Sequence, residues 1–154
     1  MAPSPRAPSQ TVLNGDSITF IIAANPGYQI TDVGVDGVSL GALSHYAFTD
    51  INADHAITAS FGVITYTLTM GKFGSGSGVI TSTPAGIDCG GTCQYAFPYN
   101  TVVTLTVTPD AGSAFFSWGD ACNGSGPCVV SMDAIKNVNV TLLTRRAYLP
   151  QLMK

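Results

Sequence analysis

The stretch TVVTLTVTPDAGSAFFSWGDACNGSGPCVVSMDAIKNVNVTLL, residues 101–143, decides how this chain is expected to fold. It opens with apolar residues that alternate with threonines, the pattern of a strand with one buried face: Val103, Leu105 and Val107. Residues 109–112, PDAG, then supply turn chemistry, because Pro fixes φ, Asp bonds its own backbone and Gly accepts positive φ. Three further apolar runs follow, at residues 115–118, 129–132 and 138–143. The stretch therefore predicts a set of strands joined by tight turns.

The composition favours strands and turns over helices. Only 10% of the 154 residues are charged, against about 25% in typical soluble domains, and there is no Glu. Polarity comes from Thr, Ser, Asn and Gly, which give a helix little to work with. The net charge is −3 with six Lys and Arg residues, so nucleic acid is not an expected partner. We expect a mainly β fold with little helix.

A second, earlier segment repeats the pattern. Residues of the same physical type recur in the same order: Ile18, Phe20, Ile22 and Gly27 correspond to Val103, Leu105, Val107 and Gly112; Ile30 and Val33 to Phe115 and Trp118; Ile51, Ile57, Ala59 and Phe61 to Met132, Val138, Val140 and Leu142. The apolar positions keep one pleat phase, so both copies are expected to bury the same face. The sequence therefore predicts two small tandem β-rich modules, either β-grasp-like or small sandwiches.

The predicted boundaries follow from composition. The chain is expected to comprise a Pro-rich linker at 1–9, a first repeat module at 10–63, a second with the cysteine pairs at 64–144, and a C-terminal tail at 145–154. Residues 1–10 lack the apolar core of a signal peptide, so we expect any exporting segment to lie outside this chain.

Between the copies lies a predicted hairpin. Strands are expected at 65–69 and 79–81, with a Gly/Ser loop over 71–78. The first copy has no equivalent hairpin, because only Pro-rich residues precede Gln10, so it is either a shorter variant or incomplete at its N-terminus. An incomplete copy leaves an unpaired strand edge, which predicts edge-strand self-association or strand addition by another chain.

The four cysteines fall into two close pairs, Cys89 with Cys93 and Cys122 with Cys128. Four cysteines allow three connectivities, and we favour the local one. It would indicate an oxidising compartment. A zinc site built from the four thiolates and free thiols are the alternatives; zinc fits the C-x3-C spacing but not C-x5-C, and no His lies close in sequence to either pair.

Several motifs of the second copy resemble a known family. They are STPAGIDC at 82–89, TVTPDAGSAFFSW at 106–118, CNGSGPC at 122–128 and MDAIKNV at 132–138. With them, residues 11–143 resemble the bacterial repeat domains related to the Listeria–Bacteroides (internalin B-repeat) family. The resemblance implies small β-rich units in tandem, generally non-catalytic, in secreted or surface-displayed proteins. The chain departs from the family pattern at 140–142, VTL, where an Ala/Val-x-Phe ending is usual, which leaves the packing of the closing strand open.

The sequence contains few residues in patterns typical of catalysis or metal binding. His45 and His55 have no nucleophile or orienting carboxylate beside them by motif, and no nucleotide-binding or hydrolase motif is present. A loop cluster of Asp36, Asp50 and Asp54 with His55 is a candidate cation site, but its spacing matches no EF-hand. We expect no enzyme, no catalytic residue, no cofactor and no metal.

The aromatic residues admit two interpretations. Phe115 and Trp118 are expected in the core, where large rings bury the most area. Phe73 and Tyr99, at predicted loop positions, are the candidates for contact with a ligand such as a sugar.

Together these features predict a non-catalytic extracellular bacterial repeat module, acting as a structural spacer or as an adhesion or interaction unit of a surface or secreted protein. The alternative is a carbohydrate-binding module appended to a secreted enzyme. The expected partner is a protein or a glycan at the cell surface. Membrane insertion is not expected, because no apolar run approaches ~18 residues.

Overall fold

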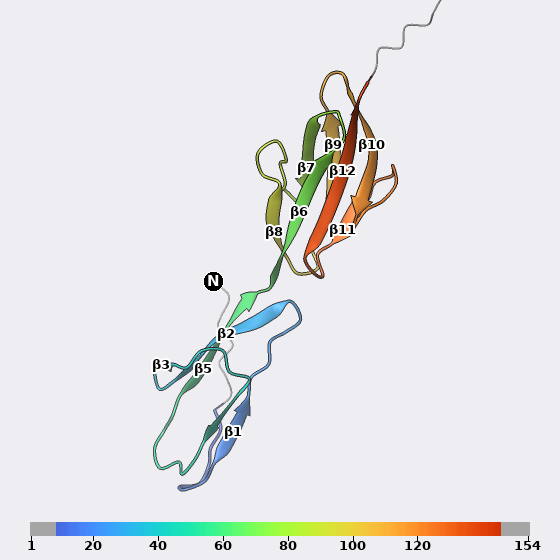
Figure 1. Ribbon diagram of the computed structural model, residues 1–154. Coiled ribbons are helices and arrows are strands. Elements are labelled where there is room, and N and C mark those ends of the chain that lie inside the picture. The colour runs from blue at the N-terminus through green and yellow to red at the C-terminus, as the bar shows by residue number, and fades with distance from the viewer. Residues whose placement is uncertain (1–8, 146–154) are drawn as a thin grey trace, which may run out of the picture. The chain divides into compact units, whose positions relative to one another are not determined.

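The computed structural model describes residues 9–145, which form two compact units divided between Gly62 and Val63 (Figure 1). We call residues 9–62 unit 1 and residues 63–145 unit 2. Within the described range every regular element is a strand, and no helix occurs that is long and apolar enough to cross a membrane. The predicted linker (1–9) and tail (145–154) lie, apart from one residue each, outside the described residues.

The strands follow the chain in order. They are β1 Ile18–Ile21, β2 Tyr28–Val35, β3 Val38–Ser39, β4 His45–Phe48, β5 Ile57–Val63, β6 Thr65–Phe73, β7 Gly78–Thr83, β8 Gln94–Pro98, β9 Val102–Pro109, β10 Ser113–Asp120, β11 Cys128–Ser131 and β12 Lys136–Thr144.

Unit 2 is a small sandwich. One sheet has the order β10-β12-β6-β8 and the other the order β11-β9-β7, and neighbours run antiparallel except for the parallel pair β12 and β6. Apolar side chains of both sheets form one buried cluster. Of the two predicted architectures the sandwich is therefore confirmed; a β-grasp would need a helix packed on its sheet, and residues 63–145 contain none.

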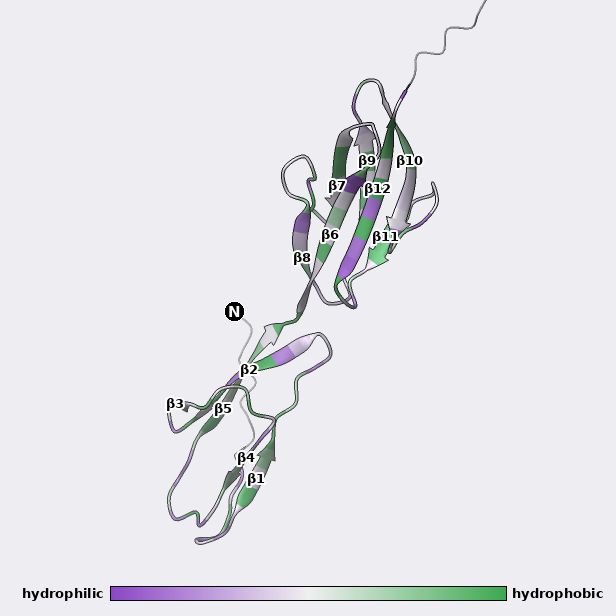
Figure 2. Cartoon of the chain, in the orientation of Figure 1, coloured by the Kyte–Doolittle hydropathy of each residue, from purple (hydrophilic) through white to green (hydrophobic). Residues whose placement is uncertain are grey.

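Strict alternation places β12 in the core of unit 2. Its apolar residues Val138, Val140 and Leu142 are 0%, 0% and 1% exposed, while Asn139 and Thr141 lie on the other face. Figure 2 shows the resulting bands of hydrophobic and hydrophilic colour along this strand. The departure from the family pattern at 140–142 thus leaves the packing of the closing strand intact, because Leu142 fills the position of the usual Phe.

The loop predicted over residues 71–78 is shorter than expected. Strand β6 continues through Phe73, so only residues 74–77 form the turn, and Phe73 is a strand residue. Gly71 pairs with Asn139 in the parallel ladder, and a Cβ on Gly71 would meet the Asn139 side chain. Glycine here allows two strands to approach closely, whereas in the sequence alone it indicated a loop.

Unit 1 has fewer strands and a smaller core. Strands β1 and β4 pair antiparallel, and a separate sheet has the order β3-β2-β5. Only Val33, Val35 and Phe48 are buried, with a ring of partly buried apolar side chains around them.

The two units share a set of backbone hydrogen bonds. The equivalent N–H to O=C pairs are Gly15 to Ile51 and Asn100 to Met132; Ile51 to Asp16 and Met132 to Thr101; Tyr28 to Asn25 and Ser113 to Asp110; Val33 to Gly41 and Trp118 to Gly124; Asp36 to Ala56 and Ala121 to Asn137. The shared turn places Gly27 and Gly112 at φ values of 84° and 82°, which glycine adopts without strain. Strands β1, β2, β4 and β5 of unit 1 therefore pair as β9, β10, β11 and β12 do in unit 2.

Candidate functional sites

The cysteines form two local disulfides, Cys89–Cys93 and Cys122–Cys128, and none is free. The local connectivity predicted from the spacing is confirmed. The zinc and free-thiol alternatives are wrong, because each sulfur is already bonded to another. Each disulfide closes one loop of unit 2.

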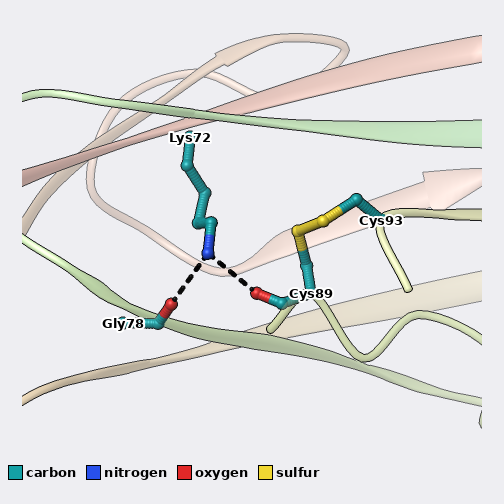
Figure 3. Close-up of a disulfide and its surroundings, with 4 residues drawn as sticks. All are labelled: Lys72, Gly78, Cys89 and Cys93. Carbon is teal, nitrogen blue, oxygen red and sulfur yellow. Dashed lines mark hydrogen bonds between the residues drawn. A yellow bond between two sulfur atoms is a disulfide. The ribbon is translucent and has the colours of Figure 1, made fainter. Parts of the chain in front are cut away.

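Lys72 braces the first of these loops (Figure 3). Its partly buried ammonium donates to the Cys89 carbonyl at 3.1 Å and to the Gly78 carbonyl at 3.4 Å, so β6 is tied to the start of β7 and to the disulfide loop. Hydrogen bonds from a charged donor are stronger than neutral ones. The sequence analysis did not single out Lys72. It could have been noticed as the one charged residue in the apolar, Thr-rich strand β6.

Trp118 holds the second loop. Its backbone N–H donates to the Gly124 carbonyl at 2.7 Å, and its indole Nε1 donates to the Gly126 carbonyl at 3.1 Å. The side chain is buried and lies 5.2 Å from the ring of Phe115, centroid to centroid. Both rings belong to the core, as their pattern predicts.

One part of the candidate cation cluster comes together. Asp36 Oδ2 lies 2.7 Å from His55 Nδ1, and Asp36 Oδ1 accepts the Ala56 N–H at 2.8 Å. The Ala56 amide, and then His55, lower the pKa of Asp36. The His55 ring in turn stacks on Phe48 at 4.9 Å. Asp50 and Asp54 complete no site with them: among residues 9–145, no group of three or more His, Cys, Asp or Glu is placed to hold a metal ion.

The two candidate ligand-contact aromatics lie far apart. Phe73 is 57% exposed at the last residue of β6. Tyr99 is half-buried near the opposite end of β6, where Thr65 pairs with Pro98. Nine residues of strand span about 30 Å, so the two rings cannot form one stacking platform for a single sugar. Contact of either ring with a ligand remains a prediction.

Unit 1 contains a hollow beside its small core. It has a volume of about 710 Å³ and is lined by residues 9–12 and Asn14 together with apolar and polar side chains, among them Phe20, His55 and Ile57. Sequence reasoning did not predict a cavity here. The feature that could have indicated it is the hairpin at 65–81, which has no equivalent in the first copy from Gln10 onward.

The family follows from unit 2. The model of the divergent InlB B-repeat domain matches residues 66–145, which are 80 of the chain's 154 residues. The chain belongs to this family. The match begins in β6 and ends just after β12, so the divergent InlB B-repeat coincides with the sandwich and its two disulfides. No curated protein and no solved structure matches the chain.

Proposed function

We propose that this chain is a non-catalytic extracellular segment of a bacterial surface or secreted protein, in which the divergent InlB B-repeat is a load-carrying spacer. One observation carries this proposal. The first and last strands of unit 2, β6 and β12, are neighbours and run parallel, from Lys136 beside Leu68 to Thr141 beside Phe73 (Figure 1).

The parallel pairing determines how unit 2 responds to tension. Force that enters at the start of β6 and leaves at the end of β12 pulls the two strands along each other. All hydrogen bonds of the pair then bear the load together, and none is separated first. A module that connects neighbouring parts of a surface protein needs this resistance along its own chain direction.

The disulfides and Lys72 support the same role. The disulfides cross-link the loops that follow β7 and β10, and Lys72 bonds the first of these loops to β6, one strand of the loaded pair. Disulfides persist in oxidising surroundings, which agrees with a place outside the cell. A sparsely charged, Thr-rich surface suits a contact unit, so we include binding of a protein or glycan in the proposed role.

Single-molecule stretching of the full chain tests the spacer role. With handles at the two chain ends, unit 2 is expected to unfold at a force severalfold above that of unit 1. Reduction of both disulfides should lengthen the released chain.

A second attachment geometry is the control. Handles at Thr65 and Tyr99 load β6 against β8, which is antiparallel to it, so the pairs separate one at a time. The unfolding force of unit 2 should fall severalfold. Equal forces in the two geometries would contradict the proposed load path.

A further inference from the structure

Equivalent apolar side chains differ in burial between the two units. In unit 2, Val138 and Leu142 are 0% and 1% exposed. Their counterparts in unit 1 are Ile57, which is half-buried, and Phe61, which is 46% exposed. The hydrogen bonds shared by the two units fix this correspondence. Unit 1 therefore lacks whatever covers these positions in unit 2.

In unit 2 the cover is the hairpin β6–β7. Strand β6 lies between β12 and β8, parallel to the first and antiparallel to the second. Its side chains Leu68 and Met70 are 0% and 5% exposed in the core. Strand β7 pairs antiparallel with β9 and adds Ile80 to the same cluster.

The cavity of unit 1 lies where β6 lies in unit 2. By the numbering offset that relates β1 to β9, residues 9–13, which form no strand, correspond in sequence to β8, and Val12 corresponds to the buried Phe97. The 710 Å³ cavity is lined by residues 9–12 and Asn14 and also by Ile57, the first residue of β5. Because β6 fills the space between β8 and β12, the cavity corresponds to one missing strand.

A second, smaller hollow of unit 1 corresponds to the turn 74–77 of unit 2. It has a volume of about 250 Å³ and is lined by Ala23, Asn25, Tyr28 and Phe61. In unit 2 the turn 74–77 fills the equivalent place. There, Gly76 donates to the Leu142 carbonyl and the Ser77 N–H donates to Ser113 Oγ, and these two acceptor residues are the counterparts of Phe61 and Tyr28.

We propose that unit 1 is a strand acceptor, which binds a β-hairpin that residues 9–145 do not supply. The first donated strand lies parallel to β5 and antiparallel to residues 9–13, and the second lies antiparallel to β1. The first strand alternates apolar with hydroxyl-bearing residues, as TYTLTM does at 65–70, and a Gly/Ser turn follows. This proposal rests on the interaction role proposed above and gives that role a partner of defined chemistry.

The register of the donor follows from unit 2. Met70 lies beside Val138 in the parallel pair, so an apolar donor residue belongs beside Ile57. The next inward donor residue towards the N-terminus, equivalent to Leu68, then lies beside His55. Such a strand would satisfy the outer edge of β5 and cover the apolar side chains that now line the cavity.

The β6–β7 hairpin is not the expected donor, because it already completes the core of unit 2. Residues 9–145 contain one such hairpin, β6–β7, and two places for it. Moving the hairpin from unit 2 of a second copy would expose Leu68, Ile80 and Phe97, all at most 2% exposed there, and would gain no net burial. The donor is therefore a hairpin segment that has no core of its own.

Titration of the ¹⁵N-labelled full chain with a synthetic peptide of residues 65–83 tests this proposal. Saturable one-to-one binding is expected, with shifts at residues 9–13, in β1 and in β5, and with the resonances of unit 2 unchanged. A peptide with Leu68→Asp and Met70→Asp should produce no shifts.

Two matched variants of β5 locate the site. Ala59 lies on the face of Ile57 and Phe61, whereas Ser60 lies on the other face, and both are exposed. Ala59→Asp should weaken peptide binding by at least about tenfold, and Ser60→Asp by less than about twofold, because only the first places a charge on the face of β5 that carries Ile57 and Phe61.

Three results would overturn the proposal. The first is that no binding occurs at millimolar peptide. The second is that the shifts are confined to unit 2, which would indicate exchange with its own hairpin. The third is that the chain self-associates through β5 and that Ala59→Asp abolishes this self-association. The last would make a second copy the occupant. Failure here leaves the spacer role testable, because the force experiment is read on unit 2 and the titration on unit 1.

Discussion

Units 1 and 2 share four strands with the same pairing, yet sixteen apolar side chains are buried in unit 2 and three in unit 1. The difference lies in the hairpin β6–β7 and in β8, which have no strand counterparts among residues 9–62. Alternating apolar residues are thus sufficient to specify the shared strands. They become a closed core only where a further layer covers them, because burial requires contact on both sides of a side chain.

Truncating one matched pair of side chains should give the largest effect. Leu142→Ala is expected to cost unit 2 about 3 kcal/mol in free energy of unfolding, because it leaves a cavity in a sealed core. Phe61→Ala, at the equivalent place in unit 1, should cost less than about 1 kcal/mol, because its ring is 46% exposed. Urea unfolding measures both: Trp118, the one Trp of the chain, reports on unit 2, and amide resonances report on unit 1. Equal losses of free energy of unfolding would mean that Phe61 is buried in unit 1 as fully as Leu142 is in unit 2.

Removing the second disulfide should have an intermediate effect. Replacing Cys122 and Cys128 by Ala is expected to lower the free energy of unfolding of unit 2 by about 2 kcal/mol, because a short loop gains entropy in the unfolded chain. Unit 1, which has no disulfide among its described residues, should not change. The same urea experiment measures the loss, with Cys89 and Cys93 intact. A drop in unit 1 would show that the two units do not unfold independently.

Acid should give the smallest effect, and it should act on unit 1. Hydrogen bonds, with Ser39 for Asp32 and with the Ala56 amide for Asp36 as the largest causes, lower the pKa of both carboxyls below their usual 3.8. The folded state therefore favours the carboxylates. Their contribution is complete above the unfolded pKa and is lost as the pH falls through 3.8 towards the lower folded values.

Amide resonances of unit 1 followed through urea unfolding between neutral pH and about pH 2.5 measure this loss. Asp36→Asn should reduce the pH dependence without abolishing it, because Asp32 remains. In unit 2 the pKa of Asp133 is lowered by its hydrogen bond with Lys136, so a small acid response there is also expected. A pH dependence of unit 1 that Asp36→Asn leaves unchanged would rule out a role for the Asp36 contacts.

Much of the fold was predictable because its signals are local. The alternation of Val103, Leu105 and Val107 and the turn glycines depend on the residues themselves and their neighbours. The disulfide pairing was also predictable, because each partner lies within six positions in sequence. The length of β6 was not, since Gly71 indicates a loop until Asn139 is known to pair with it.

The amino-acid sequence by itself determined the class of fold, the positions of nearly all strands, the pairing of the cysteines and the inward-facing residues of unit 2. The expectation that unit 1 buries the same face was wrong for Ala59 and Phe61, which are exposed. Periodicity and turn chemistry act over a few residues, so they can be read without coordinates. Only the tertiary structure decided that β6 and β12, more than sixty residues apart, lie parallel as neighbours, that Lys72 reaches the carbonyls of Gly78 and Cys89, and that a cavity remains in unit 1. These features depend on which distant segments meet, and no local pattern encodes that.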